Sequence, residues 1–159
     1  MEKAEKDFEE LLRLFNKQGV RYLIVGAFAV GFHAIPRYTK DLDVLVEPSA
    51  ENGEKICRAL KGFGFGSLKI GPEDFARKGR FIQLGYEPVR VDLITSIQGV
   101  VFDRAWKHRK KGRYGAESVY FLGLKDLVQN KQVSRRGQDL VDLEVLRKFQ
   151  RSARRQRRG

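Results

Sequence analysis

The fold is decided by the stretch GAFAVGFHAIPRYTKDLDVLV, which runs from Gly26 to Val46. Two aspartates, Asp41 and Asp43, lie one residue apart in its C-terminal part. Side chains of a strand alternate between its faces, so both carboxylates are predicted on one face, about 6 to 7 Å apart along the backbone, with Leu42 and Val44 toward the core. Unpaired, the carboxylates would repel each other and lose hydration, and a divalent cation removes both costs. Hard oxygen ligands favour Mg²⁺ or Mn²⁺ over zinc, so the pair indicates such a site.

Upstream of the aspartates, a strand is predicted to turn into a short helix. The run RYLIVG (21–26) is rich in β-branched and aromatic residues and ends in glycine, as is typical of a buried strand. A short helix is predicted over 27–34, ended by Pro36, and a second strand over 42–46. Gly26 stands at the first junction, where a glycine lets backbone N–H groups approach a phosphate at the start of the helix.

A third acid, Asp92, lies in the middle of VRVDLIT (89–95), where a lone charge among β-branched residues is costly. This run and RFIQLGY (80–86) are predicted to form a strand pair joined by Glu87-Pro88. If the strand of Asp92 lies beside the strand over 42–46, three carboxylates converge. Such a cluster can hold two metal ions about 3.5 to 4 Å apart. Asp92 is then the best candidate to accept the proton of an attacking hydroxyl, directly or through the metal.

The rest of the chain adds helices and one more strand. A helix with the apolar stripe Phe8, Leu11, Leu12 and Phe15 is predicted to end in the segment 16–19. Further elements are predicted in the following order: a helix capped by Ser49 and closing at Gly62, a short helix over 100–106, a basic loop over 107–115, a strand over 118–123, and helices over 124–133 and 138–150. Strands interspersed with helices predict an α/β (α+β) domain with a mixed sheet and C-terminal helices.

Length and charge divide the chain into two parts. With 159 residues and 42% hydrophobic content, we expect a single domain over 1–146. The formal net charge is +12, but seven Lys and Arg residues and no acid lie in 147–159, so the net charge of the rest of the chain is +5. The basic segment is predicted to be a flexible tail or an arm for a polyanion such as RNA, and a solubilising helix end fits it equally well.

Composition also excludes several classes of protein. The single cysteine, Cys57, rules out an internal disulfide and a multi-cysteine metal site, and it is expected to be a buried structural thiol. No apolar run approaches the roughly 18 residues that a membrane span needs. The N-terminal MEKAEKDFEE lacks the apolar region of a signal peptide. We therefore expect a cytoplasmic protein without a membrane partner.

The central stretch resembles a known signature. VGAFAVGFHAIPRYTKDLDVLV looks like that of the DNA polymerase β-type nucleotidyltransferases: a hydrophobic residue, Gly, Gly or Ser, a spacer, and Asp-hydrophobic-Asp. The pattern of Arg37, Thr39, Asp41 and Asp43 resembles more closely the small prokaryotic nucleotidyltransferases related to toxin–antitoxin and abortive-infection systems. LGLKDLVQNKQVSRRGQDLVDLEVL is similar to the C-terminal helices of that group. The resemblance extends over 21–146.

The resemblance implies a nucleotidyltransferase fold and the metal-dependent transfer of an NMP unit from an NTP to an acceptor hydroxyl. It implies Asp41, Asp43 and Asp92 as the catalytic residues that bind Mg²⁺ or Mn²⁺. The residues implied to bind the nucleotide are Gly26, Ala27, Arg37, Thr39, Lys131, and Arg135 or Arg136. Ala27 departs from the Gly or Ser of the signature, which keeps the backbone N–H but loses a hydroxyl contact.

Several interpretations stay open at this point. The acceptor is expected to be RNA, such as a tRNA end, or a protein hydroxyl, as in antitoxins that act on a cognate toxin. A catalytically silent nucleotide- or RNA-binding module of the same fold is the main alternative, and a metal-dependent phosphohydrolase is a weaker one. Arg37 could simply pair with an aspartate at the strand entrance, and Lys131 could be a solvated cation at a helix end. His33 is expected to be a packing residue.

Overall fold

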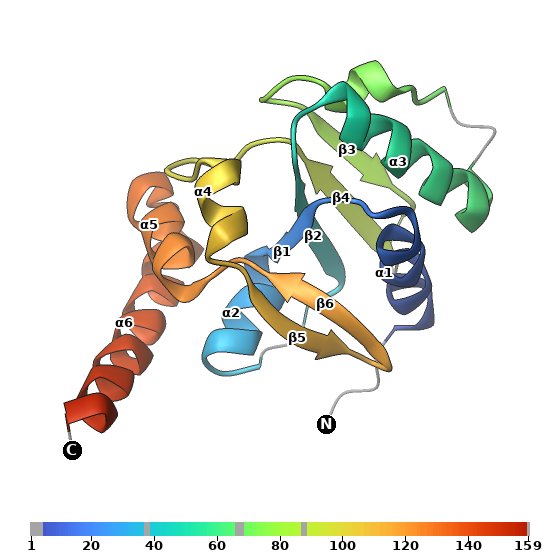
Figure 1. Cartoon of the computed structure of the whole chain (residues 1–159). Helices are drawn as coiled ribbons and strands as arrows, with labels where there is room; N and C mark the ends of the chain where they lie inside the picture. Colours follow the sequence, from blue (N-terminus) through green and yellow to red (C-terminus); the bar gives the residue numbers. More distant parts are fainter. Residues whose placement is uncertain (1–4, 37–38, 66–68, 87–88, 159) are drawn as a thin grey trace.

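The computed structural model describes residues 5–36, 39–65, 69–86 and 89–158. Within these residues, six strands form one mixed sheet in the spatial order β3-β4-β2-β1-β6-β5 (Figure 1). The strands are β1 (Tyr22–Val25), β2 (Asp41–Val46), β3 (Phe81–Leu84), β4 (Arg90–Ile94), β5 (Lys110–Tyr114) and β6 (Glu117–Phe121). The predicted α/β architecture with a mixed sheet is confirmed.

Strand β2 lies in the interior of the sheet between β1 and β4. It runs antiparallel to β1, where Val25 is the partner of Asp43, and parallel to β4, where Asp92 is the partner of Asp43. The predicted pair of strands over 80–86 and 89–95 is present, because β3 and β4 are antiparallel neighbours. The joint that was predicted at Glu87-Pro88 lies outside the described residues.

The helices cover both sides of this sheet. They are α1 (Lys6–Gln18), α2 (Gly26–His33), α3 (Ala50–Leu60), α4 (Phe102–Lys107), α5 (Leu124–Ser134) and α6 (Gly137–Arg158), with a 3₁₀ turn η2 (Pro72–Phe75). In Figure 1, α1 and α3 lie together at one side of the sheet, and α5 and α6 form a pair at the other side. Helix α2 follows β1 directly, as the glycine at the end of the strand predicted.

The two predicted boundaries of helix α3 had different outcomes. The Ser49 hydroxyl accepts a hydrogen bond of 3.1 Å from the backbone N–H of Asn52, which confirms it as the N-cap. The predicted closure at Gly62 is wrong, because the chain continues from α3 into a π-helical turn, η1 (Lys61–Phe65). Gly64, with φ +98°, is where the backbone leaves helical geometry inside that turn.

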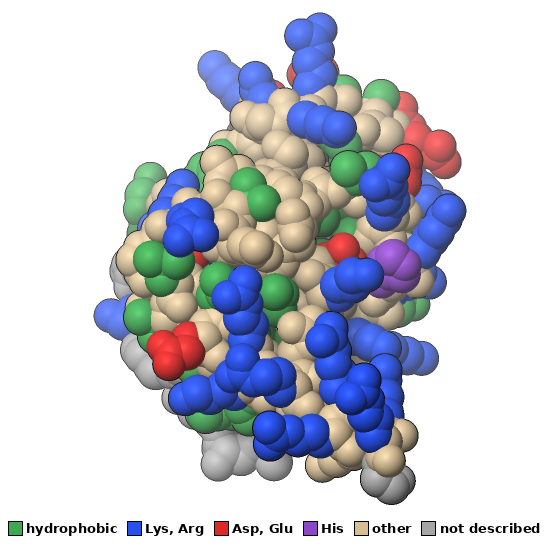
Figure 2. Space-filling view, turned by 90° about the vertical axis from the view of Figure 1, so that its left-hand side faces the viewer, with side chains coloured by type: hydrophobic (Ala, Val, Ile, Leu, Met, Phe, Trp, Pro, Cys, Tyr) green, Lys and Arg blue, Asp and Glu red, His purple; other side chains and the backbone are tan. Residues whose placement is uncertain are grey.

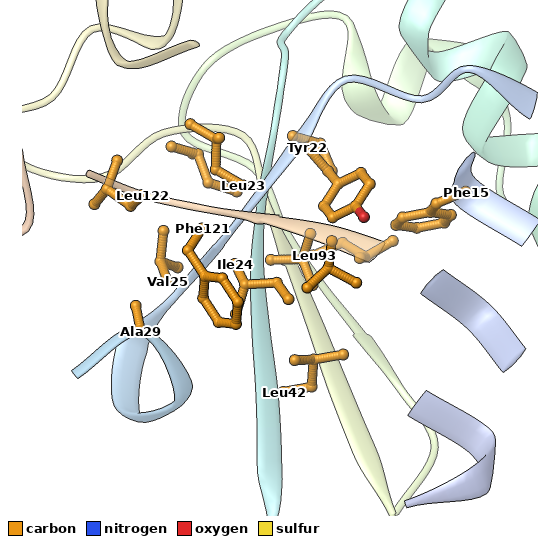
Figure 3. Packing of buried hydrophobic residues seen from close by; sticks show 14 of the residues in the cluster. Phe15, Tyr22, Leu23, Ile24, Val25, Ala29, Leu42, Leu93, Phe121 and Leu122 are labelled. Carbon is orange, nitrogen blue, oxygen red and sulfur yellow. The ribbon is translucent and has the colours of Figure 1, made fainter. Parts of the chain in front are cut away.

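The core forms because apolar side chains of the inner strands meet those of the helices. Leu42 and Val44 of β2 are fully buried, as the alternation along the strand predicted. Figure 3 shows Leu42 in one cluster with Leu93 of β4, Phe15 of α1 and Phe121 of β6. This packing fixes β2 and β4 in register, and so fixes the relative positions of the aspartates that point away from the cluster.

The prediction for the segment 107–115 was wrong. We expected a basic loop, but Lys110–Tyr114 forms strand β5, which pairs antiparallel with β6. The sequence KKGRY has no apolar alternation, because β5 is an edge strand whose side chains are largely exposed. Lysines are common on such edges, since they hinder pairing with further strands. Pairing with β6 decides the conformation here, and local propensity does not.

The C-terminal segment 147–159 was expected to be a flexible tail. In the structure, α6 is one helix from Gly137 to Arg158. The interpretation of the basic residues as the end of a helix therefore describes their secondary structure. None of the described helices combines the length and the apolar character that a membrane span requires.

Candidate active site

Asp43 and Asp92 lie side by side on adjacent parallel strands, so the condition that the sequence analysis set for their convergence is met. They are register partners between β2 and β4, and their side chains share one face of the sheet. Asp92 is buried, with 4% of its surface exposed, and Asp43 is half-buried. Two carboxylates this close in a poorly hydrated place destabilise each other's ionised form.

This proximity changes the acidity of Asp43. Burial, the neighbouring Asp92 carboxylate, a hydrogen bond with Asp92 and the charge of Asp41 together raise the pKa of Asp43 to about 7. Arg90 opposes these effects without cancelling them. Asp43 therefore holds a proton over part of the neutral pH range unless a cation binds beside it. A pKa shifted this far is typical of carboxylates in functional sites and not of ordinary surface acids.

The charge of Asp92 is balanced by Arg90, a residue that the sequence reasoning missed. The guanidinium Nε and Nη2 of Arg90 donate hydrogen bonds of 3.0 Å each to the two carboxylate oxygens of Asp92. This fork geometry is the strongest common arrangement between arginine and a carboxylate. A signal was available, because residues two apart on a strand share a face and Arg90 precedes Asp92 by two.

Arg90→Gln is expected to lower the free energy of unfolding at pH 8, because the buried carboxylate of Asp92 loses its charged partner. Urea denaturation of the metal-free protein measures this. Adding Asp92→Asn to Arg90→Gln should recover part of the loss, since the uncompensated charge is removed. An equal loss in the double variant would show that the pair does not balance charge at this position.

Gly26 packs directly against Asp43. Its φ is +67°, a left-handed conformation that side chains rarely adopt. A Cβ atom added at this position would overlap Oδ2 of Asp43. The first residue of α2 must therefore be glycine both for its backbone conformation and for its contact with the carboxylate. Val25, the N-cap residue, has no side-chain acceptor, so the first N–H groups of α2 are left for another partner, such as a phosphate.

Asp41 has the chemistry of a metal ligand, but the site is not preformed. Its Oδ1 is buried and has no hydrogen-bond partner among the described residues. An orphaned buried carboxylate oxygen beside the Asp43–Asp92 pair suits a hard cation such as Mg²⁺. Nevertheless, no group of three His, Cys, Asp or Glu side chains in the described part of the chain is placed to hold a metal ion as it stands. The donor set fits Mg²⁺ or Mn²⁺, and binding requires the side chains to move from their present hydrogen bonds.

A pocket of about 370 Å³ opens over Asp43 and Gly26. Its opposite wall is made by α5 and the start of α6, including Lys131, Ser134 and Arg136. The pocket thus brings together four residues that the sequence singled out from segments far apart in the chain. It places Lys131 and Arg136 across from Asp43, with Asp139, the ion-pair partner of Lys131, on the same wall. Arg136 is therefore the cation most available to a negatively charged ligand that a metal ion bridges to Asp43.

Lys131 is more constrained than a solvated cation at a helix end. It is buried, with 7% of its surface exposed, and its Nζ lies 2.9 Å from Asp139 and 3.3 Å from Asp142. Burial tends to raise the pKa of Asp139, but hydrogen bonds from Ser134 and Lys131 outweigh it, and the pKa is lowered. Lys131 therefore ties α5 to α6 as well as lining the pocket. Asp139 and Asp142 have a structural role, because they hold Lys131 in place.

The remaining predicted residues lie outside this pocket or outside the described chain. Ala27 follows Gly26 in the first turn of α2 and does not line the pocket. The Thr39 hydroxyl bonds to the backbone of Asp41, in the manner of an ordinary turn residue at the strand entrance. Arg37 is not among the described residues. Arg136 is exposed and lines the pocket, whereas its neighbour Arg135 does not.

His33 and Cys57 have no part in the site. Nε2 of His33 donates a hydrogen bond of 2.7 Å to the carbonyl oxygen of Leu122, so the imidazole is a satisfied packing group as expected. Burial, together with the charge of Lys110, lowers its pKa, although the bond to Leu122 opposes this. Cys57 is a free thiol on α3, only half-buried, and burial raises its pKa.

Comparison with known proteins shows which fold these elements make. No protein-family profile and no curated protein sequence matches the chain. Among solved structures, a protein of Thermotoga maritima provisionally described as a nucleotidyltransferase aligns with a TM-score of 0.55 and 16% identity, over 91% of both chains. The lincosamide antibiotic adenylyltransferase LnuA, with lincomycin bound, aligns with a TM-score of 0.56 and 14% identity, over 92% of this chain and 98% of that one. This protein therefore has the nucleotidyltransferase fold.

Proposed function

We propose that the protein is a nucleotidyltransferase that uses an NTP and Mg²⁺ or Mn²⁺ to transfer an NMP unit to a hydroxyl group of RNA or of a protein. The observation that carries this proposal is the juxtaposition of Asp43 and Asp92 on adjacent strands under a pocket lined by Gly26, Lys131 and Arg136. Asp43 lines this pocket, Asp92 lies beside Asp43 outside its lining, and Arg136 lies on the facing wall, which suits a triphosphate bound through a metal ion.

In this proposal the residues of the pocket have distinct tasks. The N–H groups at the start of α2 contact the phosphates, and the absence of a side chain at Gly26 lets them approach Asp43. Arg136, and Lys131 from its buried position, offset the negative charge that builds on the leaving pyrophosphate. Ala27 supplies its backbone N–H but no hydroxyl.

The metal would be held by Asp41 and Asp43, with Asp92 as the third carboxylate. When bound, a divalent cation stabilises the charge that develops on the transferring phosphoryl group. The acceptor oxygen forms a bond to the α-phosphorus, the bond from that phosphorus to the β-phosphate oxygen breaks, and pyrophosphate leaves. Asp92 takes the proton of the acceptor hydroxyl, which requires at least one of its two hydrogen bonds with Arg90 to open.

A direct test is to incubate the protein with each α-³²P-labelled NTP, Mg²⁺, and either total RNA or a protein fraction. We expect covalent label in one acceptor class with at least one NTP, its loss on addition of EDTA, and its loss in Asp43→Asn. Label in RNA assigns the acceptor as RNA, and label in protein assigns it as a protein such as a cognate toxin. Absence of label in both, under conditions where the NTP binds, would contradict the proposed activity.

Two observations favour the silent nucleotide-binding module as the second candidate. Arg90 occupies both oxygens of Asp92, and Ala27 lacks the hydroxyl of the nucleotidyltransferase signature. Such a module would bind NTP without transferring any part of it. The labelling experiment separates the two candidates, because the module gives binding in a titration and no covalent label.

A further inference from the structure

The basic residues of α6 are arranged on one face of the helix. Successive residues are about 100° apart around an α-helix, and six of the seven cations after Leu146 fall within an arc of about 120°. These six are Arg147, Lys148, Arg151, Arg154, Arg155 and Arg158, and we call them the α6 basic stripe. All six are exposed, and every residue from Arg151 to Arg158 is exposed. The stripe is about 17 Å long at 1.5 Å per residue.

Figure 2 shows the side of the molecule on which α5 and α6 lie, and Lys and Arg side chains gather over its lower part, where α6 ends in Figure 1. Helix α6 carries no acidic residue after Glu144. Positive charge is therefore concentrated at this end of the protein, which raises the local concentration of polyanions.

A groove lies at the inner end of the stripe. Arg135, Arg147 and Arg151 line a hollow of about 360 Å³ together with Leu140, Leu143 and Glu144. Three guanidinium groups around one hollow, against one carboxylate, make a site with a net positive charge that suits a phosphate group.

Two adjacent residues connect this groove with the candidate active site. Arg135 lines the groove, and Arg136 lines the pocket that contains Asp43 and Gly26. Arg135 has φ +51° and is the only described residue other than glycine with a left-handed backbone conformation. That conformation ends α5, and it places the two arginines on the walls of two different hollows.

We infer that the α6 basic stripe binds the phosphate backbone of an acceptor RNA, and that Arg135 and Arg136 contact the bound strand where it passes from the groove into the active-site pocket. This inference rests on the proposed function. The rise between Arg147, Arg151, Arg154 and Arg158 is about 4.5 to 6 Å per step, so one helix face meets several successive phosphates of a strand. The stripe contacts phosphates and no bases, so it positions the RNA without selecting its sequence.

The composition of α6 argues against two other occupants. A helix that lies on a membrane needs several bulky apolar residues opposite its basic face, and the basic part of α6 offers only Phe149, which is 39% exposed, and Ala153. A protein interface needs an apolar centre within the polar rim. The exposed large apolar side chains of α6 are Leu140, Val141 and Phe149, of which only Leu140 lines the groove, and none lies among the arginines after Phe149. Exposed arginines repeated along a helix end that holds no bulky apolar side chain are the pattern of backbone binding to nucleic acid.

The test is fluorescence anisotropy with a labelled RNA hairpin that has a single-stranded 3′ overhang, measured between 50 and 200 mM salt. The variant Arg147→Gln/Arg151→Gln/Arg154→Gln is expected to weaken binding at low salt by on the order of tenfold or more. It should also reduce the slope of log affinity against log salt by about 2 to 3, one contact for each arginine. The matched control is Lys17→Gln/Arg58→Gln/Lys61→Gln, which removes the same charge from exposed positions on α1, α3 and η1.

Equal weakening by the two triple variants would overturn the inference, because net charge and not the stripe would then drive binding. Failure of the wild type to bind the hairpin while it binds anionic lipid vesicles would also overturn it. Arg135→Gly keeps the left-handed turn and removes one cation, so we expect unchanged thermal stability and a slope reduced by about one. An unchanged slope in that variant would remove Arg135 from the path.

The outcome can be separated from that of the proposed function. The triple stripe variant should bind NTP as the wild type does, and Asp41→Asn/Asp43→Asn should bind the hairpin as the wild type does. If the wild type binds the hairpin but no NTP, the proposed function is contradicted and the inference about the RNA surface is not. If the wild type binds NTP but the triple stripe variant binds the hairpin as tightly as the wild type, only this inference is contradicted.

Discussion

Replacing Asp43 with asparagine is expected to reduce nucleotidyl transfer on the order of 10³-fold or more, because a ligand of the catalytic metal is lost. The same change is expected to raise the melting temperature of the metal-free protein at pH 8. An ordinary destabilising mutation would lower both quantities, so the opposite signs are the informative result. Activity and thermal melts on one preparation in EDTA, with Mg²⁺ added for the assay, give both.

The sign of the stability effect follows from the pKa of Asp43, which the fold raises from 3.8 to about 7. The folded protein holds this proton more tightly than the unfolded chain, so the contribution of Asp43 to stability falls as pH rises from about 4 to about 7. Above pH 7 the penalty is complete, and it amounts to a few kcal/mol. Asp43→Asn escapes it.

The difference in melting temperature between Asp43→Asn and wild type should therefore be near zero at pH 4 and largest at pH 8. Asp7→Asn, which removes an exposed acid from the first turn of α1, is the matched control and should show no such increase with pH. A variant that is less stable than wild type at pH 8 but still active would contradict the role given to Asp43.

Gly26→Ala is expected to abolish measurable activity and to cost about 2–4 kcal/mol of stability. Two separate effects contribute. The left-handed conformation at φ +67° disfavours any side chain, and the added methyl group would displace the carboxylate of Asp43. Displacement of a metal ligand accounts for the activity, and both effects account for the stability.

Gly19 provides a matched control for the first effect. Its φ is +70°, but no atom lies within 4 Å of the position that a Cβ would occupy. Gly19→Ala should therefore cost only the conformational part, about 1–2 kcal/mol, and leave activity unchanged. In Gly26→Ala/Asp43→Ala, part of the extra loss should be recovered, because the overlapping carboxylate is gone. Equal costs at Gly19 and Gly26 would show that Gly26 does not constrain Asp43.

The central part of the fold was predictable because its sequence signals agree with its packing. The junction of β1 and α2 is marked by a buried run that ends in glycine, and β2 is marked by the alternation of acids with Leu42 and Val44. Both signals reflect local rules, namely the period of a strand and the conformational freedom of glycine. The meeting of Asp43 with Asp92 depended on one further condition, that β4 lies next to β2, which was stated as a condition and is met.

The features that the sequence did not reveal depend on contacts between distant segments. Strand β5 is polar and basic, and only its pairing with β6 makes it a strand. Lys131 was expected to bind the nucleotide or to be a solvated cation, because nothing local shows that the first two turns of α6 bring Asp139 and Asp142 next to it. The pairing of Arg90 with Asp92 could have been predicted, because residues two apart on a strand share a face. The role of Arg37 stays a prediction.

The proposed chemistry requires that the pocket over Asp43 bind a nucleoside triphosphate through a divalent cation. The most direct measurement is isothermal titration of each NTP into the protein, with and without Mg²⁺, using wild type and Asp41→Asn/Asp43→Asn. We predict heat of binding for at least one NTP that depends on Mg²⁺ and is lost in the double variant. No binding of any NTP in the presence of Mg²⁺, or binding that is indifferent both to the metal and to the two aspartates, would contradict the account.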